Sequence, residues 1–179
     1  MMLLISTCSQ KLSEEEFVSP ISKIITSIKR VYEIKHYKEK INFEKYEKII
    51  ICGTAMKDNE YLDDLEQFNW IKTSSKPILG ICSGMQVIAL QFGGKIIKKK
   101  EIGMINVKVI RENILFSEDF VGYALHGNGI SNLIEFYLLA KSDKSVQAIK
   151  HKKKEIYGVM FHPEVRNEKL IEIFTEQSS

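Results

Sequence analysis

The sequence predicts an α/β protein in three layers, with a mostly parallel central sheet and a smaller β-rich portion. Over the first half of the chain, short apolar runs alternate with helix-like segments, which favours strands joined by helical crossovers. After Gly94 the pattern turns mostly to strands. A cysteine set between Gly80 and Gly84 ends one apolar run and begins a helical one, which is typical of a strand-to-helix nucleophile elbow.

Each element follows from the local pattern. Short runs rich in apolar and β-branched residues predict the parallel strands, at 2–7, 32–37, 48–52 and 77–82. Apolar residues recurring every three or four positions predict helices, at 21–31, 61–72, 85–92 and 169–175. Further strands are expected at 95–99, 106–110, 123–126, 136–141, 146–151 and 155–161. The 179 residues are expected to form a single domain, 1–179.

Composition narrows the class of protein. The chain is 44% hydrophobic and 27% charged, as in an ordinary globular domain, and its net charge of +3 is too small to indicate a nucleic-acid partner. No apolar stretch approaches the roughly 18 residues of a membrane span, and the apolar start at 1–5 predicts a strand, not a secretion signal. We therefore expect a cytoplasmic protein that binds neither nucleic acid nor membrane. The lysine clusters at 98–100 and 152–154 are expected to lie in a solvated hairpin or loop, with a docking patch for a partner or an anionic ligand as the alternative.

Cys82 is the candidate nucleophile. A helix that begins at the thiol favours the thiolate through its N–H groups and dipole. The alternative is a buried cysteine that acts as a small hydrophobe. Cys8, Cys52 and Cys82 each follow a predicted parallel strand, so three thiols would share one edge of the sheet. Without Cys-x-x-Cys spacing or a fourth ligand we expect no metal site, and an odd cysteine count favours a reducing compartment.

His162 and Glu164 are the candidate base and orienting acid. They follow an apolar run, and two-residue spacing in extended chain would place both side chains on one face. A carboxylate beside an imidazole fixes its tautomer and stabilises the imidazolium, as in a Cys-His-acid triad. The alternative is a His-Pro turn followed by a solvated glutamate.

Together, Gly80-x-Cys82-x-Gly84-x-Gln86 and Phe161-His162-Pro163-Glu164 resemble the class I, triad-type glutamine amidotransferases over most of the chain. Within that family the elbow and Gly93-Gly94 are similar to the amidotransferase portion of GMP synthetase. The resemblance implies that Cys82, His162 and Glu164 hydrolyse the side-chain amide of glutamine through a γ-glutamyl thioester.

Further site residues follow from the same resemblance. The backbone N–H groups of Gly53 and Ser83 would form the oxyanion hole, and Gln86, Gly127 and Asn128 would bind the substrate. His126 is expected to line the pocket in a flexible loop, because it has no nearby acid in the sequence.

The chain departs from the family pattern in four places. The loop at 52–56 has one glycine in place of Ser-Gly-Gly-Pro, and residues 6–9 replace an Asp-Gly-Gly-Gln-like segment after the first strand. Asn128 replaces the loop acid, and residues 166–168 replace Thr-His-Thr. In the family, these positions shape the pocket entrance or touch the synthetase partner. The departures therefore bear on the choice of GMP synthetase and not on the hydrolysis of glutamine.

No P-loop is present, so the chain itself would carry no cofactor. The resemblance implies a separate ATP-pyrophosphatase synthetase subunit, which would bind ATP and Mg²⁺ and receive the ammonia, most simply to convert XMP to GMP. Two alternatives remain at this point: a partner-independent Cys hydrolase of another γ-glutamyl compound, and a catalytically silent amidotransferase-like regulator.

Overall fold

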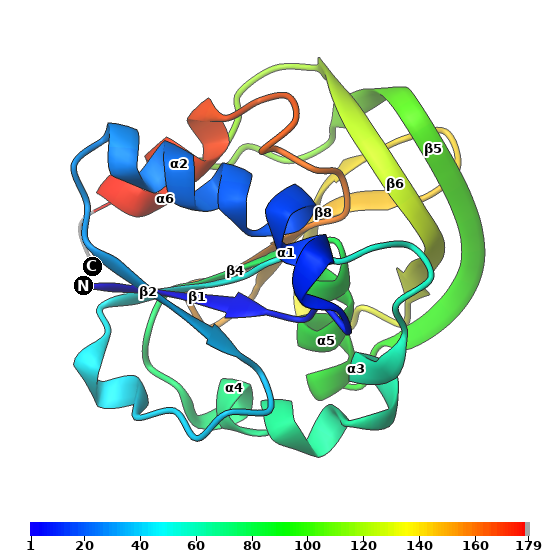
Figure 1. Cartoon of the computed structure of the whole chain (residues 1–179). Helices are drawn as coiled ribbons and strands as arrows, with labels where there is room; N and C mark the ends of the chain where they lie inside the picture. The colour runs from blue at the N-terminus through cyan, green and yellow to red at the C-terminus, as the bar shows by residue number, and fades with distance from the viewer. Residues whose placement is uncertain (178–179) are drawn as a thin grey trace.

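The computed structural model describes residues 1–177, so the last two residues of the predicted 1–179 domain lie outside the described residues. A nine-stranded sheet runs through the molecule in the order β2-β1-β3-β4-β9-β8-β7-β5-β6 (Figure 1). Its parallel half consists of β2 (Tyr32–His36), β1 (Met2–Ser6), β3 (Lys48–Ile51), β4 (Ile78–Ile81) and β9 (Ile156–Val159). The other four strands pair antiparallel: β8 (Val146–His151), β7 (Phe136–Lys141), β5 (Lys95–Val109) and β6 (Phe120–Ser131).

Helices cover both faces of the parallel half (Figure 1). One layer holds α1 (Lys11–Phe17), α2 (Ser19–Ser27) and α6 (Lys169–Glu176), and the other holds α3 (Glu60–Asp63), α4 (Trp70–Thr73) and α5 (Ser83–Gln91). Successive strand residues point to opposite faces, so Leu4 joins the core under the first layer and Leu3 the core under the second. The predicted three-layer α/β class is confirmed.

The β-rich portion follows the parallel strands, as expected, and its β7 and β8 extend the central sheet. Residues 95–109 form one long strand that pairs with β6 in a hairpin curling away from the sheet (Figure 1). The register of this hairpin shifts between Lys98 and Glu101, which marks a β-bulge.

Two helix predictions were wrong in extent. The segment expected as one helix over 61–72 folds as α3, the 3₁₀ turn η2 (Leu65–Phe68) and α4. The helix expected over 21–31 is α2, which ends at Ser27 before Lys29 takes a positive φ of 57°. α1 was not predicted.

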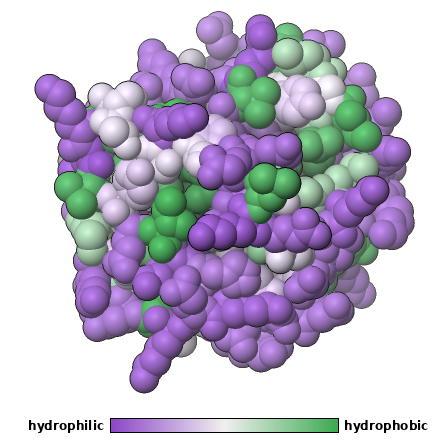
Figure 2. All heavy atoms as spheres, viewed as in Figure 1, coloured by the Kyte–Doolittle hydropathy of each residue, from purple (hydrophilic) through white to green (hydrophobic). Residues whose placement is uncertain are grey.

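The surface in Figure 2 is mainly hydrophilic, with hydrophobic residues scattered among the polar ones. Exposed apolar side chains include Ile102 and Met104 on β5. Lys98, Lys99 and Lys100 are exposed on β5 of the β5–β6 hairpin, as expected for a solvated hairpin. Within residues 1–177, no helix combines the length and apolar character needed to cross a membrane.

Candidate active site

Cys82 lies at a strained strand-to-helix turn between β4 and α5. Its φ of 50° and ψ of −102° are unusual for a residue with a side chain, and such strain costs about 1–3 kcal/mol. The turn depends on two glycines. A Cβ on Gly80 would lie 2.5 Å from the backbone of Gly84, and one on Gly84 would collide with the carbonyl oxygen of Ile51. The predicted elbow is therefore present, and it holds the thiol at the carboxyl edge of the parallel strands.

The loop after β3 passes directly beside the thiol. A Cβ on Gly53 would lie 2.9 Å from the His162 ring and 3.4 Å from the Cβ of Cys82, so only glycine lets the backbone approach both. Within residues 1–177, the N–H groups of Gly53 and Ser83 donate no hydrogen bond to the protein. Two free donors beside the nucleophile match the requirements of an oxyanion hole.

Side-chain hydroxyls fix the peptide bond that precedes Gly53. The carbonyl of Cys52 accepts hydrogen bonds from Thr7 Oγ1 at 3.1 Å and Ser83 Oγ at 3.3 Å, and the two hydroxyls are 2.8 Å apart. A trans peptide directs its C=O and N–H in opposite directions. Holding the Cys52 carbonyl therefore also aims the N–H of Gly53, even though this loop has only one glycine.

His162 and Glu164 form a buried pair. His162 Nδ1 lies 2.7 Å from Glu164 Oε1, and both side chains are at most 1% exposed. The contact arises in a turn after β9, where the N–H of Val165 donates to the His162 carbonyl, and not through two-residue alternation along a strand. Burial opposes protonation of the imidazole, but the charges of Glu164 and of a Cys82 thiolate outweigh it and raise the pKa of His162 well above its ordinary value. Nε2 of His162 is buried and makes no hydrogen bond within residues 1–177.

A small pocket adjoins the thiol and is lined by the predicted residues Gln86, Gly127 and Asn128. The amide of Gln86 is held in place: its Oε1 accepts a hydrogen bond of 2.7 Å from Tyr61, and its Nε2 donates to the Asn128 carbonyl at 3.5 Å. On the opposite wall the carbonyl of Leu125 accepts from the Cys82 thiol at 3.8 Å. The pocket therefore has one wall from α5 and one from β6.

The pocket also holds charged and polar groups that the sequence did not point out. Asp58 lines it, and its Oδ2 accepts hydrogen bonds from Thr54 Oγ1 at 2.7 Å and from the backbone N–H of Ser9 at 3.1 Å. Lys98 is not a lining residue, but its Nζ donates to Oδ1 of the lining residue Asn128 at 3.1 Å. The lining thus contains one carboxylate, and an ammonium group contacts it from outside.

The pocket is narrow. Its free volume is about 10 Å³, whereas a single water needs about 10–15 Å³ of such volume. A glutamine side chain needs more room than the lining side chains leave here.

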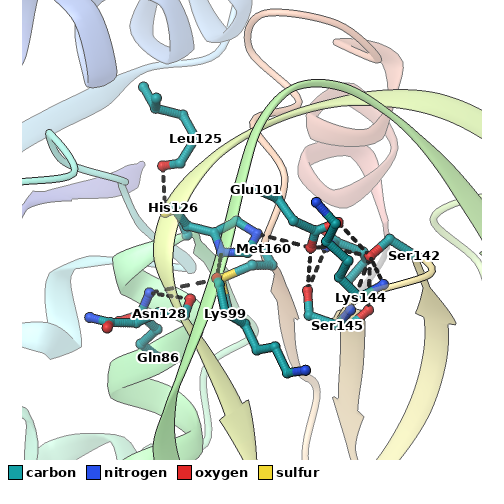
Figure 3. Close-up of polar contacts among 12 residues, drawn as sticks. Gln86, Lys99, Glu101, Leu125, His126, Asn128, Ser142, Lys144, Ser145 and Met160 are labelled. Carbon is teal, nitrogen blue, oxygen red and sulfur yellow. Dashed lines mark hydrogen bonds and ion pairs between the residues drawn. The ribbon is translucent and has the colours of Figure 1, made fainter.

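His126 lines the pocket, as expected, but its setting differs from the expectation in two respects. It lies on β6 and not in a flexible loop, and an acid does lie beside it, because Glu101 Oε2 is 3.4 Å from His126 Nε2. The pairing of these two residues across the hairpin brings together positions 25 apart in the sequence. The ring extends from the pocket wall toward Glu101 (Figure 3).

Cys8 and Cys52 share the edge of the sheet with Cys82, as predicted, and all three are free thiols. Burial raises the pKa of Cys8 and of Cys52, so both stay protonated and are poor nucleophiles. No cluster of three His, Cys, Asp or Glu side chains placed to hold a metal occurs in the part of the chain that the structure describes.

Besides Asp58, the residues that sequence reasoning missed are Thr7, Tyr61 and Glu101. Thr7 was visible only as a departure from the family pattern, and Tyr61 only as part of an apolar helix face. Glu101 follows three lysines, which favours a solvated position, yet it is 5% exposed.

Comparison with known proteins places this geometry in a family. Residues 15–175 match the family described as glutamine amidotransferase class-I. The chain is 34% identical over 158 residues to a glutamine-hydrolyzing GMP synthase subunit of Methanocaldococcus jannaschii, covering 84% of this chain and 78% of that one. It is 36% identical over 156 residues to the protein of the same name from Pyrococcus furiosus, covering 80% and 76%.

A crystal structure agrees with these sequence matches. A Thermoplasma acidophilum protein, described as a candidate subunit of GMP synthase, superposes with a TM-score of 0.84 at 27% identity, over 97% of this chain and 92% of that one. The chain belongs to the class-I glutamine amidotransferase family.

Proposed function

We propose that this chain hydrolyses the side-chain amide of glutamine and supplies the ammonia to a separate synthetase subunit, which uses ATP and Mg²⁺ to convert XMP to GMP. The observation that carries the proposal is the strained Cys82 beside two free N–H donors and the buried His162–Glu164 pair. The relatives named as glutamine-hydrolyzing GMP synthase subunits support the choice of synthetase.

The reaction follows from the atoms at the elbow. The raised pKa of His162 suits it to take the thiol proton of Cys82 as the sulfur attacks. The sulfur attacks the amide carbon of glutamine, and the resulting oxyanion accepts hydrogen bonds from the N–H groups of Gly53 and Ser83. His162 then protonates the amide nitrogen, the C–N bond breaks, and ammonia leaves a γ-glutamyl thioester on Cys82. Water attacks the thioester, His162 takes its proton, and glutamate and the thiolate are released.

Substrate recognition uses both ends of glutamine. Gln86 would bind the side-chain amide, because Tyr61 already fixes its orientation. The main-chain ammonium of glutamine needs an anion and its carboxylate needs a cation or N–H donors. Asp58 supplies the anion, because its carboxylate lines the pocket. Lys98, which donates to Oδ1 of the lining residue Asn128, is the cation nearby.

The test measures ammonia release from glutamine by the chain alone and with a GMP synthetase ATP-pyrophosphatase subunit, XMP, ATP and Mg²⁺. We expect weak release alone and strong stimulation by the partner, together with formation of GMP. Incubation with a glutamine-like electrophile should label Cys82, as seen by mass spectrometry, and Cys82→Ser should abolish both labelling and release.

Each alternative predicts a different result. Glutamine hydrolysis that no synthetase stimulates would point to a partner-independent hydrolase. Absence of both labelling and hydrolysis in the complex would mean a catalytically silent protein.

A further inference from the structure

A buried polar network stands behind the pocket wall and takes no part in the chemistry above. Its centre is Glu101, which is 5% exposed. The carboxylate accepts hydrogen bonds from Ser142 Oγ at 2.8 Å, Ser145 Oγ at 2.5 Å and Gln147 Nε2 at 2.9 Å (Figure 3). Three donors from β8 and the turn before it thus hold one carboxylate that comes from β5.

His126 connects this network to the pocket. In Figure 3 its ring lies between Glu101 on one side and the group of Asn128, Gln86 and Met160 on the other. Nδ1 of the ring lies 3.0 Å from the Lys99 carbonyl, which can only accept, so Nδ1 carries a proton. Nε2 then faces Glu101 Oε2 at 3.4 Å, makes no hydrogen bond within residues 1–177, and forms an ion pair with the carboxylate when the ring carries both protons. Burial lowers the pKa of His126, and the charge of Glu101 opposes that shift. Both ring nitrogens of His126 therefore face groups of β5.

Fixing the His126 ring restrains the residues on either side of it. The carbonyl of Leu125 accepts a hydrogen bond from the Cys82 thiol, and the carbonyl of Asn128 accepts one from the Gln86 amide. Because neighbouring residues of a strand share one hydrogen-bonded backbone, a ring anchored to β5 also limits the movement of these two carbonyls.

The network also reaches the strand that carries the base. The carbonyl of Gln147 accepts a hydrogen bond of 2.8 Å from the N–H of Met160, two residues before His162. The Sδ of Met160 in turn lies 3.8 Å from Gln86 Nε2. The Glu101 network therefore contacts both the β6 wall and the end of β9.

We propose that Glu101 is a positioning residue for glutamine binding, which acts through His126 to hold the 125–128 wall at its distance from Cys82 and Gln86. The inference rests on the proposed function. Glu101 touches neither the reacting atoms nor the cavity itself, so its effect is on affinity for glutamine more than on the chemical step.

Two substitutions separate position from charge. Glu101→Leu keeps the approximate size but leaves Ser142, Gln147 and His126 without their shared partner. Glu101→Gln keeps a hydrogen-bonding centre, because Gln147 Oε1 has no partner in the described structure and a rotated Gln147 amide can accept from the new NH₂ group. The same NH₂ group can donate to Nε2 of a neutral His126.

The experiment measures kcat and KM for glutamine in the complete synthetase complex. We expect Glu101→Leu to raise KM by about ten- to a hundredfold with kcat changed much less, because misplacement of a positioning wall costs up to that factor. Glu101→Gln should restore KM to within about threefold of the unmodified protein. Glu112→Leu, at an exposed position after β5, is the matched control and should leave both constants unchanged.

The outcomes are distinguishable. If the unmodified complex releases no ammonia, the proposed function fails and not the positioning role. If Glu101→Leu folds with an unchanged KM, or if Glu101→Gln shows the same loss as Glu101→Leu, the positioning role is overturned. Protection of Cys8 and Cys52 from iodoacetamide serves as the check on folding, because both thiols are buried in the folded protein and an unfolded chain exposes them. If Glu101→Leu does not fold, Glu101→Gln alone decides, and a KM raised more than tenfold overturns the role.

Discussion

Thr7→Val tests whether the oxyanion donor of Gly53 is aimed by a hydroxyl on the neighbouring strand end. Thr7 contributes two hydrogen bonds, one of 3.1 Å to the Cys52 carbonyl and one of 2.8 Å shared with Ser83. Valine has nearly the same shape as threonine, so the substitution removes these bonds without opening a cavity. Thr7 is absent from the pocket lining, which separates its effect from substrate contact.

The magnitudes follow from the two lost bonds. At about 1 kcal/mol each, they predict a loss of about 2 kcal/mol in the free energy of unfolding. Complete loss of an oxyanion donor costs about 2.7–4 kcal/mol of barrier, which is an upper limit here because Ser83 Oγ, 3.3 Å from the carbonyl, can donate its proton to it once Thr7 is replaced. About half of that cost gives a fall in kcat of about 10- to 30-fold.

The assay compares kcat and KM for glutamine in the complex with chemical denaturation of the same variants. Thr7→Ser keeps the hydroxyl and should stay within about threefold of the unmodified protein in kcat. A Thr7→Val protein that loses stability but keeps its kcat within about twofold would refute the reasoning, since the Gly53 peptide would then be held by other contacts.

Three further predictions concern other parts of the molecule. Glu164→Gln should lower kcat by a factor of about 10²–10⁴, because His162 loses the charge that orients it and raises its pKa, and the alkaline limit of the pH–rate profile should move to lower pH. The contribution of the His162–Glu164 pair to stability is fully present below the unfolded-state histidine pKa of about 6.5 and is lost as the pH rises through the raised folded-state pKa of His162. The free energies of unfolding of Glu164→Gln and the unmodified protein, measured in urea, should therefore become equal above that folded-state pKa. Asp58→Asn should weaken glutamine binding by about 1.5–3 kcal/mol, seen as a higher KM with kcat nearly constant. A KM equal to that of the unmodified protein would exclude Asp58 from the substrate site. Lys48→Met should lower the free energy of unfolding by about 1–3 kcal/mol, because buried Lys48 Nζ donates to three carbonyls at the end of α6. Lys45→Met, at an exposed position, is the control and should leave that free energy unchanged. Equal free energies of unfolding for the two variants in a denaturant titration would contradict the prediction.

The parallel half of the sheet was predictable because its strands are short, apolar throughout and followed by turn residues. The segment 61–72 was misjudged for a physical reason. Leu62, Leu65, Phe68 and Ile71 recur every three residues, which suits successive 3₁₀-like turns as well as one continuous helix. Periodicity alone does not separate these cases. α1 was missed because Phe17 is its only buried residue, so it has almost no apolar face to detect.

Some residues of the site were predictable from the sequence and others were not. Cys82, His162 and Glu164 lie in short motifs whose spacing is visible along the chain, and the structure brings all three together. Glu101 could not be found in this way. Its burial depends on a β-bulge after Lys98 and on the pairing of β5 with β6, and both are set by long-range contacts. A charge next to three lysines gives no local sign that it turns inward.

The catalytic side and the substrate side of the site are organised differently, and this bears on how access of glutamine can be controlled. On the catalytic side, the strained Cys82, the Gly53 peptide and the His162–Glu164 pair are each held by buried contacts before any substrate is bound. On the substrate side, the free volume of about 10 Å³ is smaller than a glutamine side chain. The lining comes from the 54–61 segment, the start of α5 and β6, and the Leu125–Cys82 and Asn128–Gln86 contacts join the last two. A partner that loosens these two contacts would widen the pocket while the His162–Glu164 pair and the Gly53 peptide stay in place.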